Sequence, residues 1–275
     1  MSFSDIGTVV LAGAGKMGSA MLAGWLEKGL DPSAVRVQDP SPAPESADFL
    51  RRHRITIENV VAPLAAPPAV IIAAVKPQVM ADVMPGLAKL AGQGTVLLSI
   101  AAGKSISSFE SFLPKGTAVV RAMPNTPAAI GRGITGAVAN AAASSAQKEL
   151  CHRLLGAVGE VVWIDDEALI DAVTAVSGSG PAYVFLLAEC LAEAGRKAGL
   201  PDDTAMQLAR ATVSGSGELL RRSDLDAATL RKNVTSPGGT TAAALNVLMR
   251  DKDGLQALMT EAVLAALKRG QELGK

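Results

Sequence analysis

Histidine and cysteine are scarce in this chain of 275 residues, which contains two of each. His53 and His152 lie outside the motif loops described below, so those loops offer no histidine as a general acid or base. Cys151 and Cys190 are far apart and match no spacing typical of a metal site or a redox motif. This pattern fits a reducing compartment, and we expect both thiols to be buried as small apolar side chains.

An excess of either charge is also absent, because 26 basic residues are balanced by 26 acidic residues. Without a basic surface, neither a nucleic acid nor an acidic membrane is an expected partner. The N-terminus has no basic region followed by an apolar core, so the sequence predicts no export signal. We therefore expect a cytoplasmic protein.

The chain has no long uninterrupted apolar run. The longest apolar stretch, residues 181–200, is broken by the charged residues Glu189, Glu193, Arg196 and Lys197. A membrane span needs about 20 consecutive apolar residues. We therefore interpret this stretch as a buried helix of a soluble protein.

The length of the chain and its 49% hydrophobic content suffice for two modest domains with well-buried cores. In the first domain, short β-branched runs alternate with helical patterns, which is typical of a largely parallel sheet. From residue 167 onward only patterns with the helical period remain. We predict an α/β Rossmann-like, doubly wound domain over 1–164 and an all-helical domain over 165–275. The predicted strands are 8–11, 35–38, 55–57, 70–74, 95–99, 118–122, 136–139 and 160–163; the predicted helices of the second domain are 167–176, 180–199, 202–222, 226–233, 240–250 and 253–272.

A glycine-rich turn follows the first predicted strand. Gly13, Gly15 and Gly18 form a G-x-G-x-x-G sequence that leads into a helical pattern. This order of strand, turn and helix is what the dinucleotide-binding fingerprint requires. Gly13 would make the tight turn, Gly15 would let a pyrophosphate approach the backbone, and Gly18 would let the helix pack on the strand. We predict that a nicotinamide dinucleotide binds here.

The acidic residue expected after the second strand is Asp39. A carboxylate at this position accepts hydrogen bonds from the ribose 2′-OH of NAD and repels the 2′-phosphate of NADP. Ser41 and the arginines at 51, 52 and 54 are groups that can instead bind a phosphate, although the arginines also fit a solvated helix face. These residues leave the choice between NADH and NADPH open.

Three further loops follow predicted strands and should line the crevice where a dinucleotide binds. These loops are 73–78, 99–103 and 121–127. Lys76 in the first loop either donates to a ribose or pyrophosphate or is simply solvated. In the third loop a rigid turn explains the two prolines, but it does not explain both the amide of Asn125 and the hydroxyl of Thr126.

The loop 235–241 combines Gly238 and Gly239 with hydroxyl side chains and runs directly into a helical pattern. Free N–H groups at a helix N-terminus attract anions, and Ser236, Thr240 and Thr241 add hydroxyl donors. A small anion is therefore a suitable ligand. The alternative is a capping loop, in which a hydroxyl only satisfies the first amides of the helix.

Together these motifs resemble those of pyrroline-5-carboxylate reductase, the last enzyme of proline biosynthesis. The resemblance spans essentially the whole chain and rests on the segments 13–18, 73–77, 99–103, 121–127, 176–183 and 234–241. The first segment is shared by many dehydrogenases, whereas the last two in this order are close to diagnostic.

The resemblance implies hydride transfer from NADPH, or from NADH, to the C=N carbon of 1-pyrroline-5-carboxylate, giving L-proline. It also implies a homodimer that assembles into a larger homo-oligomer, although the abundant alanine and glycine of the helical part fit intrachain packing equally well. The implied catalytic residue is Thr241, whose hydroxyl donates to the ring nitrogen, and no metal is expected. The implied substrate-binding residues are Ser236, Gly238, Gly239, Thr240 and Thr241; the implied cofactor-binding residues are Gly13, Gly15, Lys16, Met17, Gly18, Asp39, Ser41, Asn59, Ala74, Val75, Lys76, Pro77, Ala101 and Asn125.

Two positions depart from the family pattern. The family often has a Glu before the signature loop where this chain has the shorter Asp224, and Asp39 stands where Thr or Ser is common. Two rival functions remain. A β-hydroxyacid or imine reductase of the same architecture needs a lysine that the motif loops of the helical domain lack, and a non-catalytic NAD(P) sensor does not need the hydroxyls of loop 235–241.

Overall fold

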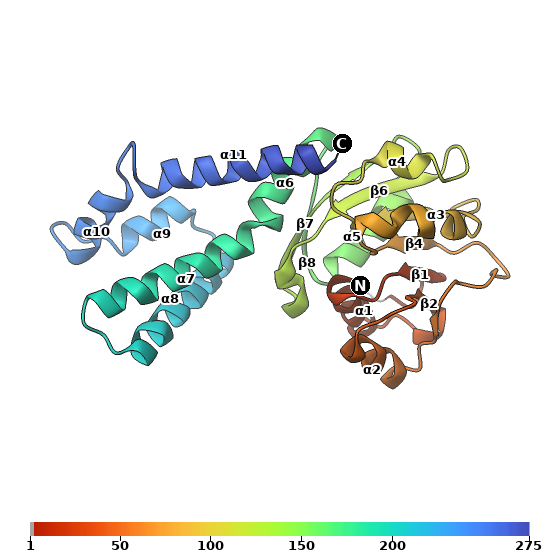
Figure 1. Cartoon of the computed structure of the whole chain (residues 1–275), viewed down its shortest axis with the longest axis horizontal. Helices are drawn as coiled ribbons and strands as arrows, with labels where there is room; N and C mark the ends of the chain where they lie inside the picture. Colours follow the sequence, from red (N-terminus) through yellow and green to blue (C-terminus); the bar gives the residue numbers. More distant parts are fainter. Residues whose placement is uncertain (1–2, 275) are drawn as a thin grey trace. The chain divides into compact units, whose positions relative to one another are not determined.

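Eight short strands in the first part of the chain pair into one sheet (Figure 1). The computed structural model describes residues 3–274. Each observed strand overlaps the strand predicted for it, and the predicted fold class is confirmed. The strands are β1 (Val9–Ala12), β2 (Val35–Gln38), β3 (Ile57–Glu58), β4 (Val70–Ala73), β5 (Val96–Ser99), β6 (Ala118–Met123), β7 (Gly133–Ala139) and β8 (Gly159–Trp163).

The strand order is β3-β2-β1-β4-β5-β6-β7-β8. All neighbouring strands run parallel except β6 and β7, which are antiparallel. The chain moves outward from β1 to β3 and then returns to add β4 on the other side of β1. Such a reversal of strand order creates a crevice at the carboxyl ends of the strands, where open α/β sheets bind their ligands.

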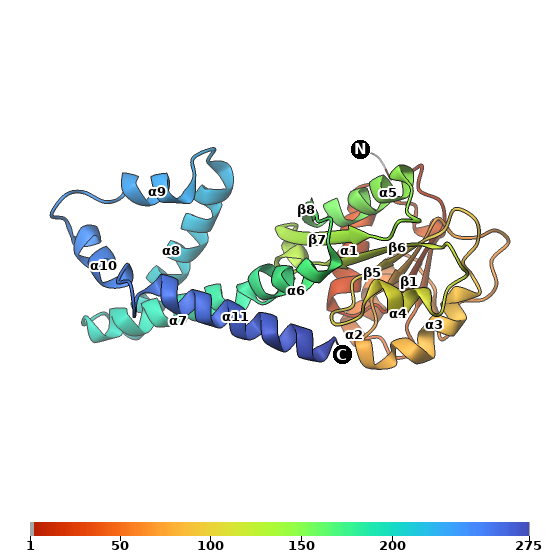
Figure 2. The same cartoon turned by 90° about the horizontal axis from the view of Figure 1, so that it is seen from above.

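Helices cover both faces of the sheet (Figure 2). Side chains of α1 (Lys16–Glu27), α2 (Pro44–Arg52) and α5 (Ser145–Gly156) belong to the apolar cluster on one face. Those of α3 (Met80–Ala88), α4 (Ile106–Glu110) and α6 (Ile170–Val173) belong to the cluster on the other face. Because strands such as β1 and β4 are covered on both sides, all of their residues are buried and apolar.

The second part of the chain is helical, as predicted. Its helices are α7 (Gly180–Lys197), α8 (Asp202–Arg222), α9 (Ala227–Asn233), α10 (Thr240–Leu248) and α11 (Leu255–Leu273). Small residues let α7 and α8 pack closely, since a Cβ built on Gly195 of α7 would lie 3.3 Å from the Cβ of Ala205 on α8. Ala192, Ala205 and Ala209 are the residues that this pair buries.

The chain divides into two compact units at a different point from the predicted 164/165 boundary. The sheet-bearing unit extends to Gly178 and includes the chain from Leu267 onward, while the helical unit is Ser179–Ala266. Two ion pairs and a hydrogen bond tie residues 165–178 to strand β6 and its following loop, as described below. The end of α11 lies against α6, where a Cβ on Gly270 would be 3.7 Å from Asp171.

The helix predicted over 167–176 is broken into three kinds of turn. A 3₁₀ turn at Glu167–Leu169 leads into α6, and a π turn follows at Thr174–Gly178. The hydroxyls of Thr174 and Ser177 donate to the carbonyls four residues earlier, at 2.8 and 2.9 Å. Such back-bonding competes with regular helix geometry, and single π turns are frequent at functional sites.

The prediction that 181–200 forms a buried helix is wrong for the single chain. Ala192 is the buried residue of α7, whereas the side chains of Phe185 and Leu186 are 63% and 57% exposed. Cys190 is exposed as well, although we expected both cysteines to be buried. Among the described helices, 167–197 is long and apolar enough to cross a membrane by length and composition alone, a test that core helices of soluble proteins also pass. A sequence pattern predicts that an apolar face will be covered, but not by which chain.

Candidate active site

The glycine-rich turn between β1 and α1 has the geometry that a pyrophosphate needs. Gly13 has a φ of +97°, and a Cβ on it would lie 2.6 Å from the carbonyl oxygen of Ala74, so only glycine fits. By contrast, a Cβ on Gly15 would meet nothing within 4 Å. No side chain caps the start of α1. The amides of Lys16, Met17 and Gly18 lie in its first turn, where the helix itself offers no acceptor, so they suit an anionic ligand.

Asp39 lies directly after β2, beside this turn. Its Oδ2 accepts a hydrogen bond from the backbone N–H of Ala14 at 2.8 Å, and its Oδ1 accepts one from Ser41 at 3.0 Å. Its own backbone N–H donates to the carbonyl of Glu58 on β3 at 3.0 Å. Asn59, which is exposed, comes directly after β3 and therefore lies at the same edge of the parallel sheet as Asp39.

The arginines proposed as phosphate ligands lie away from Asp39. Arg51 and Arg52 form the last turn of α2, a helix whose first residue follows the loop from Asp39. Eight residues of helix separate the two ends by about 12 Å. Arg51 pairs with Asp48 at 2.7 Å, and Arg54 lies beyond the helix. The interpretation of these residues as a solvated helix face is the one that the geometry supports.

The loops after β4 and β5 lie side by side next to the glycine-rich turn. The backbone N–H of Ala74 donates to Ala12 at 2.8 Å, and that of Ile100 donates to Ala73 at 3.1 Å, so the loops continue the ladder of the sheet. Ala101 is buried and donates its N–H to the hydroxyl of Ser99 at 3.2 Å. Val75 and Pro77 are partly buried, and Lys76 is exposed. The sheet thus brings together the residues that the sequence predicted at this edge.

Asn125, in the loop after β6, uses its side chain inside the protein. The side chain is buried, with Oδ1 accepting from the backbone N–H of Ile134 at 2.9 Å and Nδ2 donating to the carbonyl of Ser177 at 3.1 Å. One N–H of the amide is left for a ligand. The first role of Asn125 is therefore to connect its loop to β7 and to the π turn.

An ion cluster around the buried Arg121, next to these loops, was not predicted from the sequence. Arg121 of β6 pairs with Glu167 at 2.8 Å and with Asp171 at 3.7 Å, and its side chain is only 9% exposed. Glu167 also accepts from the backbone N–H of Ile106 at 2.8 Å, where α4 begins. The signal was an arginine within an otherwise apolar strand, because a buried charge requires a partner. The cluster fixes the end of the loop that carries Ala101.

The loop 235–241 of the helical unit leaves its hydroxyls free. Gly239 is the N-cap of α10, and no side chain caps this helix. The hydroxyls of Ser236, Thr240 and Thr241 make no hydrogen bond within the part of the chain that the structure describes. Gly238 has a φ of +68°, which turns the chain sharply before the helix. The alternative of a side-chain cap does not hold. The N–H of Gly239 donates to the carbonyl of Ser236 at 3.0 Å, and the first-turn amides of Thr240 and Thr241 and the three hydroxyls remain available to a ligand.

Two other predicted features have structural roles of their own. The segment 178–183 runs from the end of the π turn into the first turn of α7, and a Cβ on Gly178 would lie 2.9 Å from the terminal methyl group of Met123. Asp224 lies in the exposed turn before α9, whose N-cap is the neighbouring Asp226. Asp226 accepts from the N–H and the hydroxyl of Thr229 at 2.9 and 2.8 Å, and these bonds lower its pKa.

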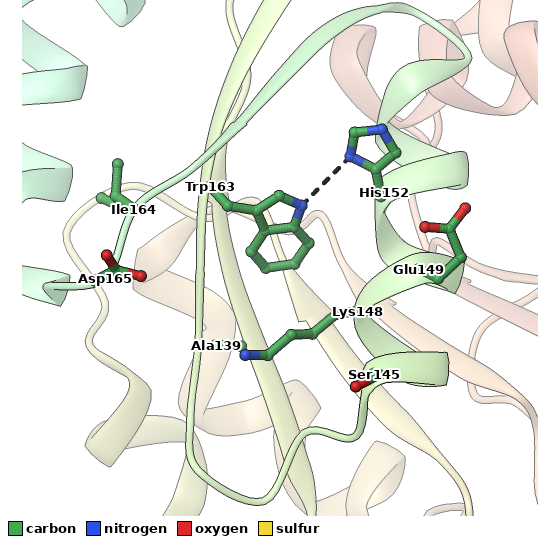
Figure 3. A pocket seen from close by; sticks show the side chains of 8 residues that line it. All are labelled: Ala139, Ser145, Lys148, Glu149, His152, Trp163, Ile164 and Asp165. Atoms are coloured by element: carbon green, nitrogen blue, oxygen red, sulfur yellow. Dashed lines mark hydrogen bonds between the residues drawn. The ribbon is translucent and has the colours of Figure 1, made fainter.

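A surface cavity of about 470 Å³ lies between α5 and β8, where Trp163 donates to the Nδ1 of His152 at 3.3 Å (Figure 3). Because β7 runs antiparallel to β6 and β8 runs parallel to β7, the end of β8 lies at the amino edge of the main sheet. The cavity is therefore opposite the edge that carries the predicted cofactor residues. Within residues 3–274 no group of three or more His, Cys, Asp or Glu side chains is placed to hold a metal.

Two sequence families match separate parts of the chain. The family described as pyrroline-5-carboxylate reductase dimerisation matches residues 167–273, and the family described as NADP oxidoreductase, coenzyme F420-dependent, matches residues 8–103. The second match contains the glycine-rich turn, Asp39 and the loop with Ala101.

Full-length relatives carry the same name as the first family. The chain is 40% identical to the pyrroline-5-carboxylate reductase of Pseudomonas aeruginosa over 97% of both chains, and 42% identical to that of Synechocystis over 96% of this chain and 97% of the relative. Among solved structures, that of the Coxiella burnetii enzyme superposes with a TM-score of 0.91 at 34% identity, covering 98% of this chain and all of the other. The Plasmodium falciparum enzyme, solved with NADP bound, gives a TM-score of 0.80 at 28% identity, with both chains fully covered.

Proposed function

The chain belongs to the pyrroline-5-carboxylate reductase family and is an NAD(P)H-dependent oxidoreductase that reduces a C=N bond, and we propose which of its residues hold the two reactants. The sheet-bearing unit binds the dinucleotide, and loop 235–241 of the helical unit binds the carboxylate of 1-pyrroline-5-carboxylate.

The dinucleotide lies along the carboxyl edge of the sheet. Its pyrophosphate is held by the first-turn amides of α1, from Lys16 to Gly18, with Gly15 leaving open space for the approach. Asp39, Ser41 and Asn59 would hold the adenosine ribose, and the loops with Ala74–Pro77, Ala101 and Asn125 would line the nicotinamide end of the site. When bound, the dinucleotide supplies the hydride that adds to the C=N carbon.

The substrate carboxylate binds to loop 235–241. The observation that carries this proposal is the uncapped start of α10 with three free hydroxyls beside it. A carboxylate has two oxygens that accept up to about four hydrogen bonds. The amides of Thr240 and Thr241, in the first turn of α10, and the hydroxyls of Ser236 and Thr240 provide up to four donors for these oxygens.

Thr241 acts on the reacting end of the substrate. Its hydroxyl donates a hydrogen bond to the ring nitrogen and stabilises the amine that forms. An aliphatic hydroxyl is too weak an acid to be the ultimate proton source. The substrate therefore binds already protonated as an iminium, or water supplies the proton through Thr241. The orientation of the hydride donor toward the C=N carbon then provides most of the rate enhancement. This agrees with the absence of histidine from every loop of the site.

Assembly and location follow from the same assignment. The match to a dimerisation domain and the exposed apolar face of α7 support a homodimer, which we propose assembles into a larger homo-oligomer. The two free cysteines of the described chain fit a cytoplasmic location. The resemblance favours NADPH as the hydride donor, whereas Asp39 favours NADH.

The test is to mix purified protein with 1-pyrroline-5-carboxylate and NADPH or NADH separately, and to follow the loss of dihydronicotinamide absorbance. A reaction without the imine is the control. Imine-dependent oxidation that yields proline supports the proposal. If folded protein binds a dinucleotide but oxidises neither cofactor, the assignment fails. Oxidation of a β-hydroxyacid by the same protein would then favour the rival reductase.

A further inference from the structure

The carboxylate of Asp39 already occupies the backbone donors that a ribose phosphate would need. The N–H groups of Ala14 and Ser41 donate to the two oxygens of this carboxylate, at 2.8 and 3.0 Å. These two hydrogen bonds fix the charge of Asp39 at the end of β2. The side chain thus acts as an anion built into the site.

An anion fixed at this place accepts from hydroxyls and rejects phosphate. Each carboxylate oxygen has two lone pairs, so one acceptor position per oxygen remains after the backbone bonds are counted. The 2′- and 3′-hydroxyls of an adenosine ribose can donate to these positions. A 2′-phosphate has no hydrogen to donate at neutral pH beyond a minor fraction, and its charge has the same sign as that of Asp39.

Two arginines close to Asp39 in the sequence are paired with other carboxylates. Arg36 is paired with Glu58 at 2.6 Å, and Arg51 is paired with Asp48 at the far end of α2. The first turn of α2 adds another acidic residue, Glu45, instead of a base. Neither Arg36 nor Arg51 is therefore free to balance the charge of Asp39.

We propose that Asp39 is the specificity-determining residue of the dinucleotide site and that it makes this enzyme prefer NADH to NADPH. The inference rests on the proposed function only in that the dinucleotide binds at the glycine-rich turn. It does not depend on which imine the enzyme reduces.

The experiment measures binding rather than turnover. Isothermal titration of the full-length protein with ADP-ribose and with its 2′-phosphate isolates the effect of the phosphate, and the same comparison follows with NADH and NADPH. We expect the ligands without the phosphate to bind about 10- to 100-fold more tightly, which is the range for the loss of a charged hydrogen bond. Asp39→Ser should reduce this ratio at least about tenfold, chiefly by strengthening the binding of the phosphorylated ligands.

Asp48→Ser is the matched control, since Asp48 is an exposed acidic residue of α2 that contacts Arg51 and not the glycine-rich turn. In this variant the ratio of affinities for the ligands without and with the phosphate should equal that of the unchanged protein. A shift as large as that of Asp39→Ser would show a general charge effect and overturn the role of Asp39. The unchanged protein alone can overturn the inference. It does so if it binds both kinds of ligand equally, if it binds the phosphorylated ligands more tightly, or if it binds neither. Selective binding of NADH by a protein that reduces no imine would leave the inference standing and overturn the proposed reaction.

Discussion

Asn125 donates a hydrogen bond from its side-chain amide to the backbone carbonyl of Ser177 at 3.1 Å, across 52 positions of sequence. The contact joins the loop after β6 to the π turn that precedes the helical unit. Asn140 makes a similar bridge at the other end of the same pair of strands, where it accepts from Val119 at 3.0 Å and donates to Thr117 at 3.0 Å. The two asparagines therefore have matched chemistry, but only one lies at the cofactor edge.

This pair gives a test of what the bridge at Asn125 does. Asn125→Ala and Asn140→Ala each leave a backbone N–H and a carbonyl without a partner, and each should lower the free energy of unfolding by about 1–3 kcal/mol. Turnover of the imine should fall in Asn125→Ala alone, because only that variant releases the π turn. Denaturant unfolding and kcat measured on both variants decide this, and equal kcat values would show that the bridge only stabilises the fold.

Substitution of Thr241 separates catalysis from cofactor binding. Thr241→Ala should lower kcat about tenfold or more, since one hydrogen bond to the developing amine is lost, while the Kd of the dinucleotide stays the same. Thr241→Ser keeps the hydroxyl and should restore most of the rate. Parallel loss of turnover and dinucleotide affinity in the alanine variant would contradict the assigned role and indicate a collapsed loop.

Gly13 should not tolerate a side chain. In Gly13→Ala the new Cβ would overlap the carbonyl oxygen of Ala74, in addition to the strain of a φ of +97°. Gly116 is the control, because its φ is +83° but a Cβ there meets nothing within 4 Å. Gly116→Ala should cost only the strain, about 1–2 kcal/mol, and keep dinucleotide affinity. Gly13→Ala should be less stable than Gly116→Ala and should bind the dinucleotide weakly. Similar stability and affinity in the two variants would refute the close packing of Gly13 against Ala74.

The exposed apolar face of α7 predicts where the dimer forms. Phe185→Asp places a charge on a side chain that is 63% exposed in the single chain and should convert the dimer to monomers in sedimentation measurements. Val60→Asp is the control, since Val60 is 65% exposed in the sheet-bearing unit and has no role in the helical pair. A Phe185→Asp protein that remains dimeric at the same concentration would place the interface elsewhere.

The ion pairs of Glu218 should make the stability of the protein depend on pH. Hydrogen bonds from Arg221 at 2.7 Å and Arg222 at 2.6 Å lower the pKa of its carboxyl from 4.5 to about 2. A lowered pKa in the folded state stabilises the protein above pH 4.5, and this contribution disappears as the pH falls toward 2. The pairs are exposed, so salt should also weaken them.

Unfolding by urea, measured from pH 7 to pH 3, checks this dependence. Glu218→Gln should be less stable than the unchanged protein at pH 7, and the difference should shrink as the pH falls below 4.5. Glu261→Gln, at an exposed position of α11, should show no such trend. A difference between Glu218→Gln and the unchanged protein that stays constant over this range would exclude the ion pairs as its source.

Local patterns in the sequence were sufficient for the elements and for the conformation of the glycine-rich turn. The strands were predicted because short β-branched runs in a doubly covered sheet carry a strong signal, and α8 was predicted with its observed ends because Pro201 marks its start. The tight turn at Gly13 and the open space at Gly15 followed from the fingerprint, since the backbone conformation there depends on neighbouring residues in the chain.

Tertiary structure alone decided how polar side chains are used. The sequence placed Asn125 in a cofactor loop, but its bonds to Ile134 and Ser177 depend on strands and turns that meet only after folding. The arginines near Asp39 in sequence proved to lie at the far end of α2, because a helix separates neighbours by its length. Likewise the apolar pattern of α7 showed that its face must be covered, while burial within one chain or by a second chain depends on packing that no local pattern encodes. The sequence determined the elements and the loops that carry the chemistry, because those depend on local conformation; the partners of each side chain were decided by the fold, because they come from distant parts of the chain.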